Sequence, residues 1–147
     1  MNFFTRIFRY LTGKPQELRG AIVFEEAKVC VPLPPDWGYY AVGDNTYLAS
    51  ADKEVGGLIV SAHHIIMSEV GDFVNPYTNR VEEITPEKYG RFDTYEIQGE
   101  GEREWARIWD TETSTHFIRL MYCCPKSHNQ TEIETIKHIV DSVKETP

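Results

Sequence analysis

In this 147-residue sequence, the histidines are the side chains whose chemistry and spacing most resemble those of a reactive site. His63 and His64 are adjacent, and His116 opens a later run that reads as a strand. Successive strand residues face opposite sides of a sheet, so one of the two paired rings is expected to meet His116. Imidazoles suit a zinc ion, but the sequence does not define a third ligand. We therefore expect no metal and no cofactor, and favour histidines that pack or hydrogen-bond in the ordinary way.

The same histidines permit a second interpretation, a small hydrolase or ligand-binding protein with a pocket formed by His63, His116 and Trp105. That interpretation requires the three side chains to converge in one cleft. The sequence contains no Gly-rich phosphate loop, no HExxH motif and no nucleophile elbow. We assign no catalytic residue and favour binding over catalysis, leaving enzymatic activity open.

Three cysteines, Cys30, Cys123 and Cys124, lack the spacing of a zinc site or of a redox CxxC pair. Neighbouring strand residues face opposite sides, so Cys123 and Cys124 are not expected to line one pocket. Reduced cysteines packed in a core indicate a reducing compartment, and we expect the protein to be cytoplasmic.

Charge is distributed unevenly along the chain, whose formal net charge is −8. Residues 1–20 hold four basic residues and one acidic residue, whereas residues 82–112 hold ten acidic and four basic ones. An acidic body repels a phosphate backbone, so nucleic acid is not an expected partner. A basic protein would be attracted, although a charged surface that only maintains solubility explains the same composition. The candidate partner-binding residues are Glu82, Glu83, Glu87, Glu100 and Glu102.

The first residues have the pattern of an amphipathic helix over 1–13. Its apolar positions follow the i, i+3, i+4, i+7 spacing, and they are Phe4, Ile7, Phe8 and Leu11. Packing of this helix on its own domain is the favoured interpretation. Contact of residues 1–11 with an anionic membrane surface is the alternative. No stretch of the chain approaches the ~20 apolar residues that a membrane span needs.

From residue 21 onward, short apolar and alternating runs separated by turn residues predict strands. The last apolar stripe predicts a helix that begins near Thr131 with a capping-box pattern. One short helix is also expected over 86–89. Together these elements predict a single α+β domain over 1–147. It would have an antiparallel sheet of about six to seven strands with an N-terminal and a C-terminal helix packed on it. The expected strands lie at 21–24, 28–31, 39–42, 46–49, 58–63, 92–98, 104–110 and 116–123.

Several short segments resemble the Mog1/PsbP-like proteins, a group that includes small bacterial domains of unassigned function and some toxin-immunity proteins. The resemblance covers about residues 21–145 in element order, and its segments are 29–32, 34–37, 58–61, 120–122 and 139–143. It implies an antiparallel sheet with packed helices, and a binding or scaffolding role more often than catalysis. With the acidic segment, this leads us to expect a non-enzymatic interaction module, an immunity or adaptor protein with a basic partner.

Overall fold

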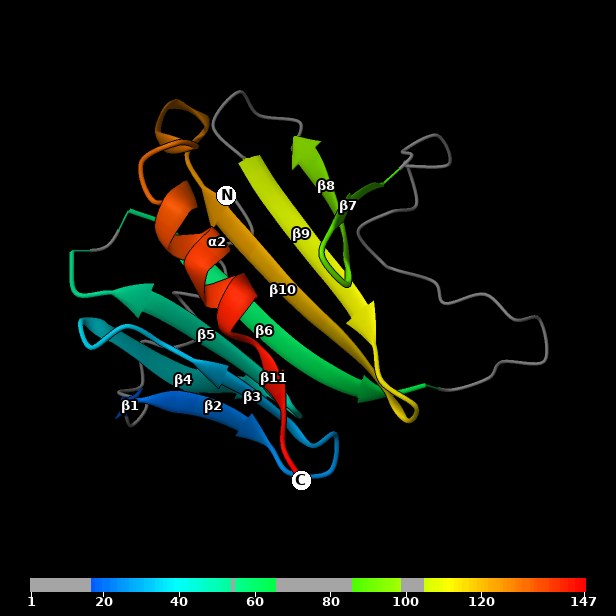
Figure 1. Cartoon of the computed structure of the whole chain (residues 1–147). Coiled ribbons are helices and arrows are strands. Elements are labelled where there is room, and N and C mark those ends of the chain that lie inside the picture. Colours follow the sequence, from blue (N-terminus) through cyan, green and yellow to red (C-terminus); the bar gives the residue numbers. More distant parts are fainter. Residues whose placement is uncertain (1–16, 54, 66–85, 99–104) are drawn as a thin grey trace.

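A computed structural model describes residues 17–53, 55–65, 86–98 and 105–147 (Figure 1). Most of these residues belong to an eight-stranded antiparallel sheet with the strand order β1-β4-β5-β6-β10-β9-β8-β7. Its strands are β1 (Leu18–Arg19), β4 (Trp37–Gly43), β5 (Thr46–Ala51), β6 (Gly57–His64), β7 (Glu87–Tyr89), β8 (Phe92–Gln98), β9 (Trp105–Glu112) and β10 (His116–Cys124). The hairpin β4–β5 and the meander β8–β9–β10 correspond to the strands expected at 39–42, 46–49, 92–98, 104–110 and 116–123.

A second, three-stranded sheet has the order β11-β3-β2. It consists of β2 (Ala21–Phe24), β3 (Val29–Pro32) and β11 (Lys144–Glu145), all paired antiparallel. Strand β3 ends at Pro32, and Pro34 and Pro35 follow it. A proline has no N–H to donate to a ladder, so the strand does not continue. The chain then enters β4 and the large sheet, so the β2–β3 hairpin is left as a separate layer.

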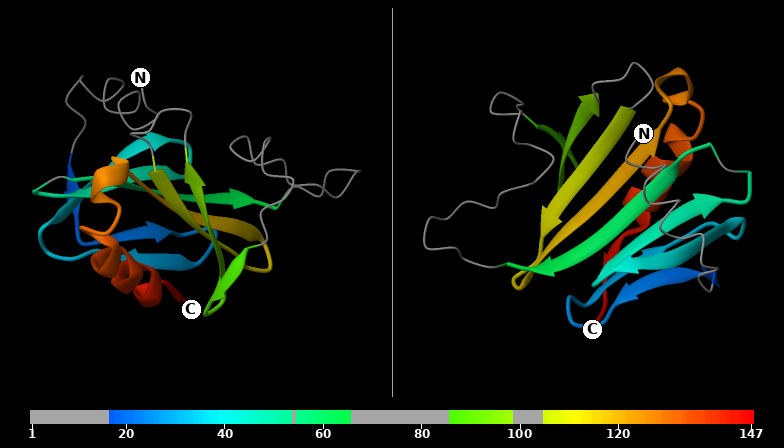
Figure 2. Two further views of the ribbon diagram at one scale, coloured as in Figure 1. Left: turned by 90° about the horizontal axis from the view of Figure 1, so that it is seen from above. Right: turned by 180° about the vertical axis from the view of Figure 1, so that it is seen from behind.

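The main core lies between the large sheet and a layer made of the small sheet and helix α2 (Ile133–Ser142). Figure 2 shows α2, β2 and β3 on the same side of the large sheet. Even-numbered residues of β10 face this core, and Leu120 and Tyr122 are fully buried there. The helix buries a stripe at helical spacing, which consists of Ile133, Ile136, Ile139 and Val140.

The opposite face of the large sheet holds a second apolar cluster: Leu48, Ile59, Ile108, Met121 and Cys123. A buried ion pair lies on the same face, in which Arg119 Nε donates to Asp110 Oδ1 at 2.7 Å. Tyr95 accepts a further hydrogen bond from Arg119 at 3.1 Å. The large sheet therefore separates two apolar layers, and strands β5, β6, β9 and β10 contribute buried residues to both.

The predicted α+β fold class was wrong, because the described residues are mostly antiparallel strand. The described residues form two sheets rather than one, and their one α-helix is C-terminal. The expected N-terminal helix, over 1–13, lies outside the described residues. Residues 86–89, expected to be helical, contain strand β7, which pairs with β8. Alternation within a strand identifies its two faces, but it does not say which strands share a sheet.

The start of α2 also differs from the capping-box prediction. Glu132 is its N-cap and makes no side-chain capping bond. The Glu132 carboxylate instead accepts hydrogen bonds from the Tyr122 hydroxyl at 2.7 Å and from the Gly56 amide at 3.1 Å. Tertiary contacts to the large sheet have thus replaced the local cap that the sequence pattern indicated.

Candidate metal centre

Two histidines meet at one end of the β6–β10 strand pair. His64 is the last residue of β6, and His116, the first of β10, lies directly opposite it. Their ring centroids are 4.1 Å apart, with the rings tilted by 37°. His63 is paired with Phe117 and faces the other side of the sheet, where it is exposed. The prediction that one of the two adjacent histidines meets His116 across the sheet is confirmed, and that residue is His64.

A third candidate ligand comes from the small sheet. Glu26 lies in the turn between β2 and β3, and its Oε2 is 3.2 Å from His64 Nε2. Each of Glu26, His64 and His116 offers a donor atom, and these atoms all lie within 4.8 Å of one another. Glu26 was not among the residues predicted from the sequence, because its proximity to the histidines depends on how the β2–β3 hairpin packs over the large sheet.

The β9–β10 turn fixes the position of His116. The Thr113 hydroxyl accepts a hydrogen bond from the His116 amide at 2.9 Å, and the Thr113 amide donates to the His116 carbonyl at 2.8 Å. Thr115 Oγ1 lies 2.7 Å from His116 Nδ1. When Nδ1 carries its proton toward Thr115, Nε2 is the nitrogen left to bind an ion. Such a hydrogen bond is the usual means by which a protein orients a histidine ligand.

Burial and nearby charges set the protonation state of His116. His116 is 3% exposed, whereas the side chains of His64 and Glu26 are 64% and 77% exposed. Burial lowers the pKa of His116 below its usual value, and the nearby His64 ring lowers it further, while Glu26 acts in the opposite direction. A neutral imidazole is the form that binds metal ions. The cluster therefore presents one neutral, buried nitrogen beside two accessible donors.

The spacing of the donors suits a small divalent ion. Two ligands about 2.0–2.1 Å from a tetrahedral zinc ion lie about 3.3 Å from one another. The 3.2 Å separation of His64 Nε2 and Glu26 Oε2 matches that value. His116 lies within 4.8 Å of them, so a small rotation of the exposed His64 or Glu26 side chain would complete a three-ligand set. Two imidazoles and a carboxylate are ligands that zinc accepts.

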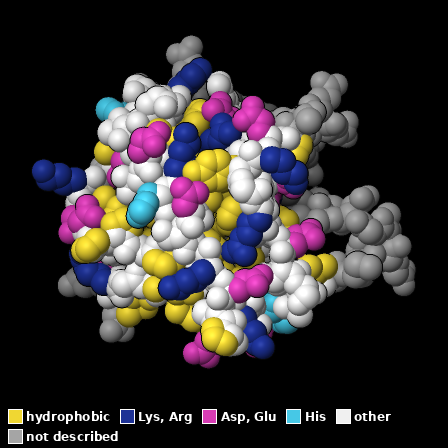
Figure 3. Space-filling view, in the orientation of Figure 1, with side chains coloured by type: hydrophobic (Ala, Val, Ile, Leu, Met, Phe, Trp, Pro, Cys, Tyr) yellow, Lys and Arg dark blue, Asp and Glu magenta, His cyan; other side chains and the backbone are white. Residues whose placement is uncertain are grey.

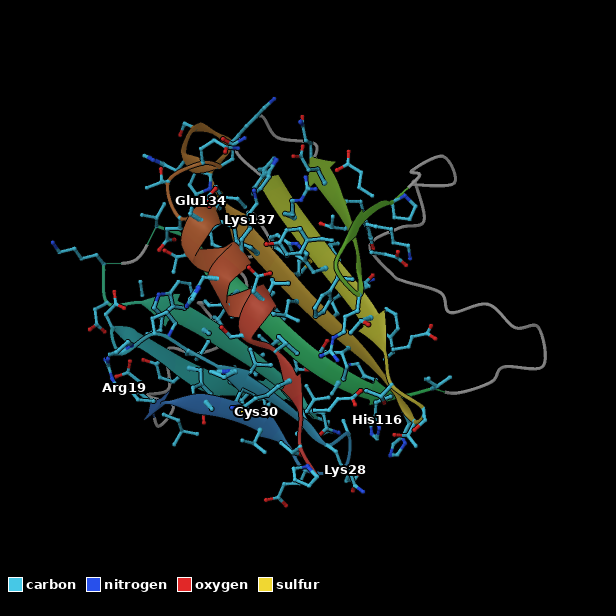
Figure 4. All side chains as sticks on the ribbon, in the orientation of Figure 1. Arg19, Lys28, Cys30, His116, Glu134 and Lys137 are labelled. Carbon is cyan, nitrogen blue, oxygen red and sulfur yellow. The ribbon has the colours of Figure 1, made fainter. Side chains whose placement is uncertain are left out.

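The structure separates the three residues of the predicted pocket. His116 and Trp105 face the same side of the large sheet, but Trp105 is paired with Cys124 at the opposite end of β10. From His116 to Cys124, eight residues further along β10, a strand extends about 26 Å. His63 lies on the other face. Figure 4 shows His116 beside the strand ends, distant from Glu134 at the start of α2. Of the three, His116 alone takes part in the metal cluster.

The predicted acidic partner surface is described only in part. Glu87 lies on β7, its side chain is 82% exposed, and its carboxylate is 3.6 Å from the Arg107 guanidinium. Glu82, Glu83, Glu100 and Glu102 lie outside the described residues. On the face that carries α2, acidic and basic side chains are interspersed (Figure 3). The described part of that face therefore shows a mixture of charges in place of one acidic patch.

The cysteines are buried, and Cys123 and Cys124 lie on opposite faces of β10, as expected from strand alternation. Burial raises the pKa of the Cys124 thiol to about 11. A thiol with so high a pKa is not a ready nucleophile at neutral pH. Cys124 is therefore a packing residue of the core.

The described helices include none with the length and apolarity needed to cross a membrane. The longest of them, α2, has ten residues.

Comparisons with known proteins give a structural neighbour but no family. No family model matches the chain, and no curated protein matches it. A crystal structure of a protein from Bacteroides thetaiotaomicron VPI-5482, determined at 1.50 Å resolution, is similar, with a TM-score of 0.63 and 18% sequence identity. The match covers 88% of this chain and 50% of the other, so this chain spans about half the length of that protein. At this identity the similarity shows a shared fold alone. The resemblance to the Mog1/PsbP-like group stays a prediction.

Proposed function

We propose that this chain is a ligand-binding protein that takes a divalent transition-metal ion, with zinc as the best-fitting ion, through His64, His116 and Glu26. The observation that carries the proposal is the convergence of these three donors, within 4.8 Å, from three separate segments of the chain. This function develops the binding alternative drawn from the histidines, with Glu26 in place of His63 and Trp105.

Each ligand contributes differently to the proposed site. His116 is buried and oriented by Thr115, so it supplies a fixed nitrogen. His64 and Glu26 are exposed and already in contact, so they are able to move onto an entering ion. Three protein ligands leave one tetrahedral position for water or another donor. That position would face solvent, because two of the three ligands do.

The ordinary alternative is an exposed ion pair next to two packed rings. Exposed pairs contribute about 0–1 kcal/mol and need no ligand. Titration calorimetry with zinc distinguishes the two interpretations, and absorption of the cobalt(II)-substituted protein reports the ligand geometry. We expect one zinc per chain, and a tetrahedral cobalt spectrum.

Single substitutions test which residues bind the ion. His116→Ala should weaken zinc binding by at least about 100-fold, since loss of even an outer hydrogen-bonding partner weakens metal sites by about 10–100-fold. His63→Ala is the matched control, because His63 is adjacent in sequence but faces the other side of the sheet. Circular dichroism checks that both variants fold. Equal zinc affinity in the two variants would refute the assignment.

A second candidate function is the interaction module with a basic partner. It is favoured by Glu87, which exposes most of its carboxylate on β7, an edge strand of the large sheet. Edge strands present unpaired backbone groups to other chains. The test is capture of a stoichiometric basic protein at low salt by the wild type but not by a Glu82→Lys, Glu83→Lys, Glu87→Lys variant. Capture that is unaffected by salt or by these reversals would contradict it.

A further inference from the structure

The three proposed ligands belong to two different sheets. His64 and His116 end adjacent strands of the eight-stranded sheet, whereas Glu26 lies in the hairpin turn of the three-stranded sheet. The sheets pack face to face, and α2 covers the end of the core farther from this cluster (Figure 1). An ion held by all three residues would therefore join the two layers where α2 does not cover them.

We propose that the metal ion acts as a bridge that closes the β2–β3 hairpin onto the end of the β6–β10 strand pair. This inference rests on the proposed metal site. Among the described residues, the one ion pair that joins this turn to the large sheet is the contact between Glu26 and His64, which are 38 residues apart. Both side chains are mostly exposed, so this contact alone is a weak link.

The hydrogen bonds of the hairpin turn lie within its own sheet, whereas Ala27 in the middle of the turn packs into the main core. The Lys28 amide donates to the Glu25 carbonyl at 3.3 Å, and Lys28 adopts a positive φ of 55°. The Lys28 carbonyl accepts a hydrogen bond from the Thr146 amide at 2.8 Å, just beyond β11. These bonds order the turn but do not attach it to β6 or β10. Local opening of such a turn is expected to be easier than opening of the buried strands below it.

A metal bridge changes that local opening in a specific way. Opening the turn would remove Glu26 from the ion, so bound zinc opposes the opening to the extent that Glu26 contributes to affinity. The effect should be concentrated in residues 24–29 and in the partner strand β11. Strand β8, which is separated from β10 by β9, should change less.

Hydrogen exchange measured by mass spectrometry, with and without saturating zinc, tests this bridge. In the wild type we expect zinc to slow exchange in residues 24–29 by about ten-fold or more. Glu25→Gln is the matched control, because Glu25 is an exposed carboxylate of the same turn but is not in the cluster, and it should behave like the wild type. Glu26→Gln should bind zinc more weakly and, when saturated at higher zinc, should show no slowing in the turn.

The outcomes separate the two proposals. Failure of the wild type to bind zinc overturns the proposed function and the bridge together. Zinc binding that requires His64 and His116 but is unchanged by Glu26→Gln keeps the metal site and overturns the bridge. Equal slowing over both sheets, or slowing that persists in Glu26→Gln, also overturns it, since the ion would then stabilise the fold without closing the hairpin.

Discussion

The two ends of the β6–β10 strand pair place a carboxylate from a neighbouring element against the same face of the sheet, but in opposite surroundings. At one end, near the start of α2, Glu132 is half-buried and accepts hydrogen bonds from Tyr122 and Gly56. At the other end, Glu26 contacts His64 while both side chains remain mostly exposed. We call these the closed end and the open end.

Burial makes the chemistry of the two ends differ. At the closed end the Tyr122 and Cys124 pKa values are raised chiefly by burial, so both groups stay protonated and serve as fixed structural parts. At the open end a neutral imidazole lies beside accessible donors that are not bound to structural partners in the core. We therefore expect the closed end to determine stability and the open end to determine ligand binding.

The largest effect on stability is expected from Gly56→Ala at the closed end. A Cβ atom there would overlap the Cys123 carbonyl and lie 2.6 Å from the Tyr122 hydroxyl. Because backbone is in the way, the strands would have to shift, and we expect a loss of about 3 kcal/mol in the free energy of unfolding. Urea denaturation measures it. Gly43→Ala is the control, since its Cβ would meet only Thr46 at 3.9 Å; similar losses in both would contradict a packed closed end.

A smaller loss is expected from Tyr122→Phe. It removes the donor that lies 2.7 Å from Glu132 and leaves the buried part of that carboxylate with one hydrogen bond fewer. Leaving a buried polar group unsatisfied costs about 1–3 kcal/mol, and we expect about 2 kcal/mol in the same denaturation experiment. Glu132→Gln keeps an acceptor oxygen and should lose less. If Glu132→Gln were the more damaging change, the charge of Glu132 would matter more than the hydrogen bond.

Alkaline pH should weaken the closed end selectively. The pKa of the Cys124 thiol is about 11 in the folded protein, above its ordinary value near 9. The folded state therefore keeps a proton that the unfolded state releases, and stability falls as pH rises from about 9 to 11. The loss is on the order of 3 kcal/mol, because each pKa unit corresponds to 1.36 kcal/mol. Denaturation at several pH values should show a shallower decline for Cys124→Ala, and an unchanged slope would contradict the assignment.

Strand positions were largely predictable from the sequence because they depend on local alternation. Strand alternation predicted that one of His63 and His64 would meet His116, and that Cys123 and Cys124 would lie on opposite faces. Two-residue and three-residue strands such as β1, β7 and β11 carry too few residues to show a period.

Contacts between the sheets were not predictable in the same way. Glu26 looks like any exposed turn carboxylate in the sequence, and it becomes a candidate ligand only because the β2–β3 hairpin folds over the end of the large sheet. Glu132 likewise lies between Thr131 and Glu134, the residues expected to cap the helix, yet it accepts hydrogen bonds from residues distant in sequence. Both cases depend on tertiary packing, which the spacing of residues along the chain does not encode.

The smallest effect on stability is expected at the open end. Glu26→Gln, measured with a chelator and without metal, should change the free energy of unfolding by less than about 0.5 kcal/mol, because an exposed ion pair contributes little. With zinc added, the same variant should gain much less thermal stability than the wild type, since the ion stabilises the fold only to the extent that it binds. A large loss without metal would mean that Glu26 is a structural residue like Glu132. The contrast between the two ends would then disappear, because both carboxylates would act by holding a neighbouring element onto the β6–β10 pair.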